Sequence, residues 1–156
     1  MMGMQKLLAW LSPAFPIGAF AWSAGLESAI SEQAVTDSAT LQNWIGGALA
    51  HGAIRTDAIL LAQAHRPVTE TTQQPDAPSD PAEEDAHGTA ISAELTALAD
   101  LCFALTPAAE RYAETASTGS AFALAAGAWP AAILTRLPQP CPYPIAVGAI
   151  AAAHDL

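Results

Sequence analysis

Apolar residues recur at helical spacing along this 156-residue chain, and this spacing indicates its fold class. One apolar stripe, with intervals typical of one helix face, consists of Leu41, Trp44, Ile45 and Leu49. A second stripe of the same kind consists of Leu95, Leu98, Cys102 and Leu105. Alternation of apolar and polar residues, the signature of a half-buried strand, persists nowhere. We therefore predict an all-α protein.

Composition indicates how these helices pack and which partners are excluded. The chain is 52% hydrophobic, and much of that share is alanine, which forms helices well but buries little area. Several closely packed, alanine-rich helices in a single domain, residues 1–156, are therefore expected. The net charge is −10, with only five Lys and Arg residues, which are scattered. Nucleic acids and anionic membrane surfaces both require clustered positive charge, so neither is an expected partner.

The segment 66–89 differs from its flanks. It contains prolines at positions 67, 75, 78 and 81, many acidic residues and almost nothing to bury. We predict a long, solvated, acidic and proline-rich loop inserted within the single helical domain.

Local signals give several expected helix ends. Thr36, Asp37 and Ser38 are ready N-caps for the helix that carries Trp44, and its Gly46-Gly47 pair predicts close packing against a neighbour. Thr106 as N-cap and Pro107 at the first position predict a helix over 107–126. The charge-free run 115–135 is interrupted by Pro130 and suits a buried helix better than a lipid-embedded one. A last helix of small residues is expected from Pro144.

The stretch from Leu7 to Ile30 has three interpretations: a secretion signal, a membrane anchor, or part of a folded domain. Pro13 and Pro16 break the apolar region twice, which argues against the first two. We predict a short helix over 4–11, a proline-stiffened elbow, and a second helix from Ser23. The elbow gathers aromatic residues, which either plug the core or form a docking surface: Phe15, Phe20 and Trp22.

No constellation of catalytic, cofactor-binding or metal-binding residues is evident. The four histidines never approach ligand spacing, and there is no phosphate-binding glycine loop or nucleophile elbow. Glu110 and Glu114 share a helix face but mainly complement the helix dipole, and Arg111 projects away from them. Cys102 is expected to be a small buried residue rather than half of a disulfide with Cys141. We therefore predict that the chain is not an enzyme.

Three segments together resemble the UreF family of urease accessory proteins. The family's opening signature reads approximately S-P-x-x-P-x-G-A/S-F/Y-x-x-S-x-G-L-E, and residues 12–27 match it from Ser12 to Glu27. The segment PAAERYAETASTGSAF, residues 107–122, is similar to the family's central helix. The segment YPIAVGAIAAA, residues 143–153, is similar to a further family helix.

The resemblance implies a cytoplasmic, all-helical, dimer-forming protein without catalysis of its own. Such a protein works beside UreD (also called UreH) and the GTPase UreG, which together load nickel into apo-urease, and it is thought to bridge the two. Nickel is then handled through the complex and not bound by this chain alone. Under this interpretation the interface candidates are Phe15, Phe20, Trp22 and Glu27, with Glu110, Arg111 and Glu114 as a second group.

This chain departs from the family pattern in two places. Its acidic segment is longer than expected, and the family continues beyond position 156 into a P-L-G-Q-T-x-x-Q-like segment. We therefore expect a fragment, a truncated reading frame or a divergent member of the family. Two other functions stay open: a nickel-binding metallochaperone that uses His87 and the acidic loop, and an exported helical protein.

Overall fold

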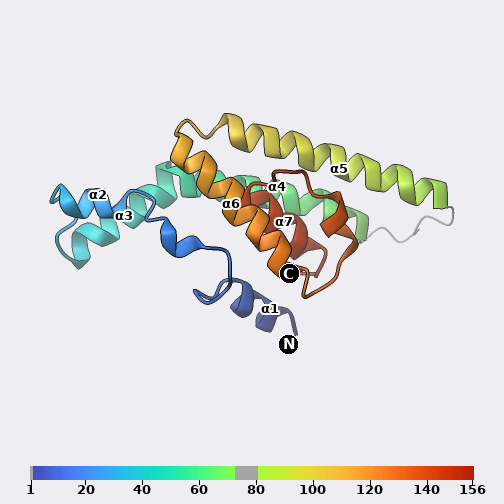
Figure 1. Cartoon of the computed structure of the whole chain (residues 1–156), viewed down its shortest axis with the longest axis horizontal. Helices are drawn as coiled ribbons and strands as arrows, with labels where there is room; N and C mark the ends of the chain where they lie inside the picture. The colour runs from blue at the N-terminus through green and yellow to red at the C-terminus, as the bar shows by residue number, and fades with distance from the viewer. Residues whose placement is uncertain (1, 73–80) are drawn as a thin grey trace.

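The computed structural model describes residues 2–72 and 81–156, and within them every regular element is helical. This confirms the predicted all-α fold (Figure 1). The α-helices are α1 (Met2–Trp10), α2 (Leu26–Ser31), α3 (Ser38–His51), α4 (Ala53–Thr72), α5 (Pro81–Ala104), α6 (Ala109–Ala126) and α7 (Tyr143–Ala152). Two short 3-10 helices join them, η1 (Ala19–Ala21) and η2 (Ala132–Arg136).

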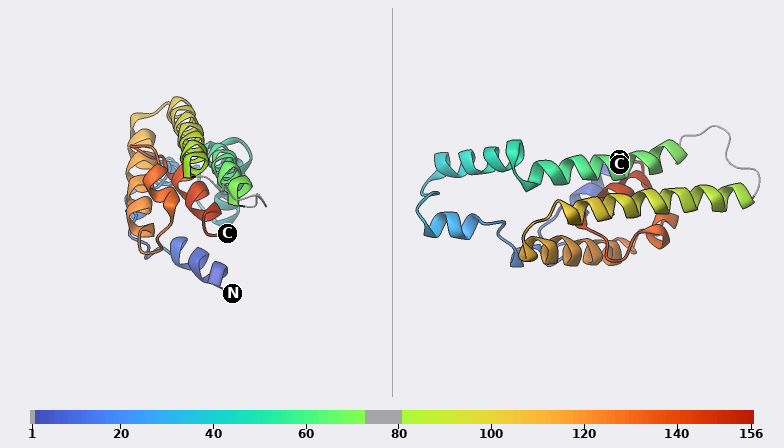
Figure 2. Two further views of the ribbon diagram at one scale, coloured as in Figure 1. Left: turned by 90° about the vertical axis from the view of Figure 1, so that its right-hand side faces the viewer. Right: turned by 90° about the horizontal axis from the view of Figure 1, so that it is seen from above.

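Helix α7 is the centre of the fold, and every residue from Pro144 to Ala152 is buried. Such a helix is apolar all round, so it needs neighbours on each side. Helices α4 and α6 supply the most extensive contacts, and α5 and η2 add further ones. Viewed along the long axis, these elements surround α7 (Figure 2). The last helix predicted from Pro144 is confirmed and begins one residue earlier, at Tyr143, whereas its position at the centre of the core is a finding of the structure.

Two glycines let backbones approach α7 closely. A Cβ atom placed on Gly148 would lie 2.3 Å from the carbonyl oxygen of Leu61 on α4. A Cβ atom on Gly119 of α6 would lie 2.1 Å from the carbonyl oxygen of Cys141, just before α7 begins. Real Cβ atoms do not come this close to backbone, so only glycine fits at either position. The helices around α7 are therefore packed at backbone contact.

The N-terminal helix α1 joins this core chiefly through one large side chain, that of Trp10. Trp10 is 1% exposed, and its ring packs edge-on against Phe122 and Trp129 at centroid distances of 5.6 and 5.9 Å. Lys6 Nζ lies 3.0 Å from Nδ1 of His154, whose Nε2 lies 3.2 Å from the Trp129 carbonyl oxygen. Helix α1 is therefore tied to the end of α7 by aromatic packing and hydrogen bonds.

Helix extends further into the predicted loop than its composition indicates. Helix α4 continues through Pro67 to Thr72, and α5 already begins at Pro81, so the bounds 66–89 were wrong. The reason is packing: Val68 and Ile91 are buried in the core, and this outweighs the missing N–H of Pro67. Residues 73–80 of the predicted loop lie outside the described residues.

Two further expectations about helix ends are corrected. Helix α6 begins at Ala109 without a side-chain cap, because the Thr106 hydroxyl donates to the Cys102 carbonyl oxygen (2.7 Å) at the end of α5 instead. Helix α2 begins at Leu26 and not at Ser23, after Gly25 takes a left-handed conformation (φ 87°). The cap of α3 is confirmed: Asp37 accepts from the backbone N–H of Thr40 (2.8 Å) in a capping box.

Helices α2 and α3 form an arm that projects from the body. Figure 2 shows α3 following α4 almost in line and carrying α2 away from the other helices. The apolar stripe predicted on α3 faces outward here, since Trp44, Ile45 and Leu49 are all exposed. Apart from the nearby backbone of α3 itself, no described atom lies within 4 Å of a Cβ built on Gly46 or Gly47, so the close packing predicted for this pair is wrong among the described residues.

Candidate functional site

The proline-stiffened elbow between α1 and α2 folds back on itself by short-range hydrogen bonds. The backbone N–H of Phe15 donates to the Ser12 carbonyl oxygen (2.9 Å), and that of Ile17 to the Phe15 carbonyl oxygen (2.8 Å). Gly18 then adopts a left-handed conformation (φ 72°), which allows η1 to begin. Local geometry therefore fixes the path of the elbow.

An open aromatic cavity of about 390 Å³ lies between the elbow and the side chains of Trp10 and Tyr143. Its lining includes Trp10, Phe15, Phe20, Trp22 and the ring of Tyr143 at the start of α7. Most of this lining is apolar, and binding sites in proteins commonly have this size and character. The cavity is thus suited to an apolar or aromatic group from another molecule.

The structure divides the elbow aromatics between the two roles left open by the sequence. Phe15 packs on the core, with ring centroids 5.5 Å from Phe122 and 6.4 Å from Trp129. Phe20 is 86% exposed, and Trp22 is half-buried beside it. Glu27 is exposed in the first turn of α2. Phe15 therefore plugs the core, whereas Phe20 offers a free aromatic surface.

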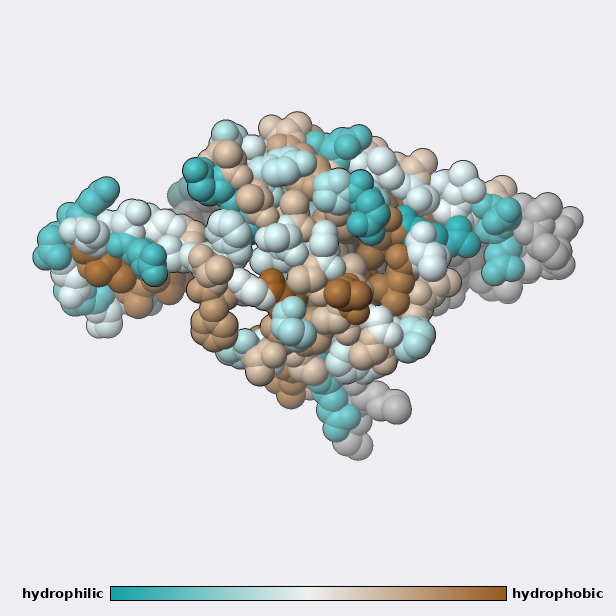
Figure 3. All heavy atoms as spheres, viewed as in Figure 1, coloured by the Kyte–Doolittle hydropathy of each residue, from teal (hydrophilic) through white to brown (hydrophobic). Residues whose placement is uncertain are grey.

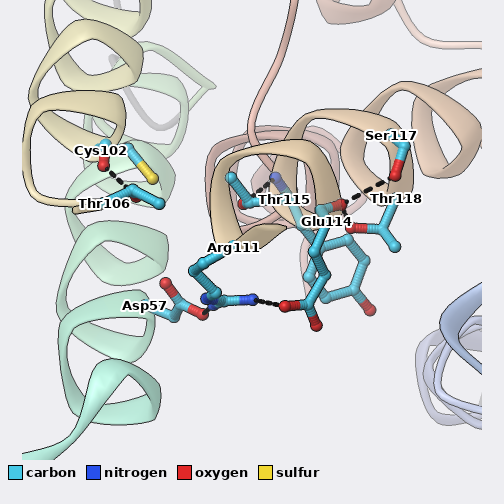
Figure 4. Close-up of polar contacts among 9 residues, drawn as sticks. Asp57, Cys102, Thr106, Arg111, Glu114, Thr115, Ser117 and Thr118 are labelled. Atoms are coloured by element: carbon cyan, nitrogen blue, oxygen red, sulfur yellow. Dashed lines mark hydrogen bonds and ion pairs between the residues drawn. The ribbon is translucent and has the colours of Figure 1, made fainter. Parts of the chain in front are cut away.

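The second group of candidates belongs to the start of α6, where Figure 4 shows Arg111 and Glu114. Arg111 Nη1 contacts Glu114 Oε2 at 2.8 Å, and its other terminal nitrogen pairs with Asp57 of α4. The sequence predicts that Arg111 projects away from both glutamates. This prediction is wrong for Glu114, because residues three apart lie on the same face of a helix. Glu110 is exposed and takes no part in this cluster.

Asp57 is the member of this cluster that the sequence did not single out. It lies three residues before buried Leu60 and seven before buried Ala64, so it shares the apolar stripe of α4. A carboxylate on such a stripe needs a cationic partner when it is buried. The position of Asp57 on this apolar stripe is the sequence signal that could have identified it as a paired carboxylate. The Arg111–Asp57 ion pair joins α4 to α6, near the point where the Tyr143 backbone N–H donates to Thr115 Oγ1 (3.2 Å).

Burial decides the protonation behaviour of the titratable groups here. Burial raises the pKa of Asp57 above its ordinary value of 3.8, although the Arg111 guanidinium opposes the shift. Burial also raises the pKa of the Cys102 thiol to about 11 and that of Cys141 to about 12. Both cysteines are free and buried, so neither offers a thiolate at neutral pH.

We expect Arg111→Met to lower the free energy of unfolding at neutral pH by about 2 kcal/mol, because it leaves two partly buried carboxylates without their cation. Asp57 has a raised pKa in the folded state, so its contribution is favourable at low pH and is lost as pH rises through that pKa. A protonated Asp57 carries no charge for Arg111 to neutralise. The loss of unfolding free energy caused by Arg111→Met should therefore shrink as the pH falls towards 3.8.

Urea unfolding of both proteins across this pH range measures the effect. Arg55→Met, which removes an exposed arginine on α4, is the matched control and should change stability little at any pH. A cost of Arg111→Met that stayed constant with pH would contradict the role given to Asp57.

In the part of the chain that the structure describes, no three His, Cys, Asp or Glu side chains come together as metal ligands. His65 and His154 make hydrogen bonds to the carbonyl oxygens of Leu156 (2.8 Å) and Trp129 (3.2 Å). No helix among the described residues is long and apolar enough to cross a membrane.

These features define a class: an all-helical protein with an exposed aromatic elbow and a projecting apolar arm, both suited to contact with other proteins. The family described as UreF matches residues 35–156. The chain belongs to the UreF family, which confirms the resemblance drawn from its motifs.

Curated relatives agree with this assignment. The urease accessory protein UreF of Rhizobium etli (strain ATCC 51251) is 46% identical over 153 residues, which is 98% of this chain and 59% of the relative. The corresponding protein of Agrobacterium fabrum is 43% identical over the same shares, and urease accessory protein UreF 1 of Brucella anthropi is 37% identical. The chain therefore spans about three fifths of these relatives' length. No solved structure matches it.

Proposed function

We propose that this chain acts as a urease accessory protein that assists nickel insertion into apo-urease. It acts without catalysis of its own, as a cytoplasmic scaffold that bridges UreD (or UreH) and the GTPase UreG. The observation that carries the proposal is an exposed aromatic elbow in a chain of the UreF family, whose relatives are named urease accessory proteins.

The elbow has both core-packing and exposed aromatic residues, and this combination supports a scaffold role. Trp10 and Phe15 hold the elbow on the core, while Phe20 is exposed at the mouth of the cavity. Aromatic side chains of this kind commonly anchor protein interfaces, because they bury a large area with few rotatable bonds. Glu27, on the next helix, adds a charge that can select the partner.

The cluster of Asp57, Arg111 and Glu114 supports the scaffold in a different way. It lies between α4 and α6, and it fixes the first turns of α6 against the body. We propose that it positions the exposed start of α6, including Glu110, for a second contact. Nickel then stays with the assembled complex, and homodimer formation remains a prediction from the family.

The direct test uses the chain as bait in cells that carry the other urease accessory proteins and urease. Recovery of UreD and UreG on the bait, together with nickel-loaded active urease, is the expected result. A soluble, helical bait that recovers neither protein would overturn bridging by these residues. Binding of nickel by the bait alone, with no partner recovered, would instead favour a metallochaperone.

A further inference from the structure

The arm formed by α2 and α3 is a structured element with an uncovered apolar surface. Ile30 of α2 and Trp44, Ile45 and Leu49 of α3 are each between 39% and 55% exposed. Figure 3 shows apolar side chains gathered on the arm and flanked by hydrophilic ones. Single exposed apolar residues are ordinary, but a cluster of this kind on a projecting element marks an interaction site.

Local hydrogen bonds fix the connection between the two helices of the arm. Ala29 and Val35 are buried at this connection, and the backbone N–H groups of Ala34 and Val35 both donate to the Ala29 carbonyl oxygen. The capping box of Asp37 and Thr40 fixes the start of α3. The apolar surface is therefore preorganised, so a partner would not have to order it on binding.

The charge on the arm has one sign. Glu27, Glu32 and Asp37 are exposed, and the sequence contains no Lys or Arg between Lys6 and Arg55. An anionic lipid surface would be repelled by these carboxylates. Two arms packed face to face in a symmetric pair would bring the same carboxylates together, which disfavours a second copy at this surface.

We propose that the arm docks a partner protein that presents an apolar contact surface bordered by Lys or Arg. The exposed side chains of α3 supply the apolar contact, and Glu27 and Glu32 pair with the basic border. This inference rests on the proposed scaffold function and adds a second contact surface, which adjoins the elbow and shares Glu27 with it. Charge complementarity of this kind raises the association rate and selects among partners.

The test uses a synthetic amphipathic helix of roughly 18 residues, long enough for five turns, made of leucine and lysine. A second peptide with glutamate in place of every lysine is the control. Binding to the whole chain is measured by calorimetry at two salt concentrations. We expect the leucine–lysine peptide to bind more weakly as salt rises, and the leucine–glutamate peptide not to bind.

Two charge-reversal variants separate the arm from the general acidity of the chain. Glu27→Lys/Glu32→Lys should weaken binding of the leucine–lysine peptide by about tenfold or more. Glu94→Lys/Asp100→Lys makes the same change in net charge at exposed positions of α5 and should weaken it far less. Ile45→Ser/Leu49→Ser should also weaken binding, with helix content and melting temperature unchanged, since both residues are exposed.

Three results would overturn the proposal. Equal weakening by both charge-reversal variants would mean that only net charge matters. Absence of peptide binding would mean that the arm has no such site. A concentration-dependent dimer that Ile45→Ser/Leu49→Ser abolishes would mean that a second copy occupies the surface. The assay contains no urease component, so its failure is separate from failure of the bridging role.

Discussion

Gly148→Ala is expected to lower the free energy of unfolding by about 3 kcal/mol, because it places a methyl group where two helix backbones meet. The added Cβ would lie 2.3 Å from the Leu61 carbonyl oxygen and 3.2 Å from the Ala64 Cβ. Neither neighbour is the end of a flexible side chain, so α4 and α7 must move apart. Urea unfolding followed by circular dichroism measures the change.

Gly46→Ala is the matched control, since it makes the same chemical change in the interior of an exposed helix. No described atom outside the adjacent backbone of α3 lies within 4 Å of the added Cβ, and alanine favours helix, so stability should rise by about 0.5 to 1 kcal/mol. The two variants should therefore move stability in opposite directions. A neutral Gly148→Ala would contradict the backbone contact between α4 and α7.

Trp10→Ala should cost about 3 to 5 kcal/mol, the range for removing a large buried aromatic side chain. Trp10 is 1% exposed and contacts Phe122, Trp129 and His154. The loss would also free α1 and the base of the elbow, so partner binding should fall together with stability. Thermal unfolding and partner retention, measured on one preparation, report both effects.

Two other variants sharpen this prediction. Trp10→Phe keeps much of the ring packing and removes an indole N–H that has no hydrogen-bond partner among the described residues, so its cost should be clearly smaller. Leu8→Ala, on the same helix but 67% exposed, should change stability little. A Leu8→Ala variant as damaging as Trp10→Ala would contradict Trp10 as the main side chain that packs α1 on the core.

The helical class, the existence of the last helix and a polar N-cap among residues 36–38 could all be predicted from the sequence, because each depends on local spacing or chemistry. What covers a helix face depends instead on the tertiary arrangement. The stripe with Trp44 and the stripe with Leu95 look alike in sequence, yet Leu95 is fully buried and Trp44 is exposed on the arm. Spacing identifies an apolar face but not its neighbour.

The candidate site shows the same limit. The elbow and its aromatics were visible as a proline-stiffened, aromatic-rich stretch, but only the fold separates Phe15 on the core from exposed Phe20. Asp57 was missed because its partner Arg111 lies 54 positions away in the sequence. Thr106 is of a residue type that commonly caps helices, but its hydroxyl donates a hydrogen bond to the carbonyl oxygen of Cys102 instead.

The central claim is that the exposed elbow binds partners while other residues hold the fold. The most direct measurement is retention of UreD (or UreH) and UreG by Phe20→Ala and by Glu27→Ala, with melting temperatures taken on the same samples. We predict that retention falls about tenfold while the melting temperature stays within about 2 °C of the parent chain. Full retention by both variants, or a loss of binding that only follows a loss of fold, would contradict the account.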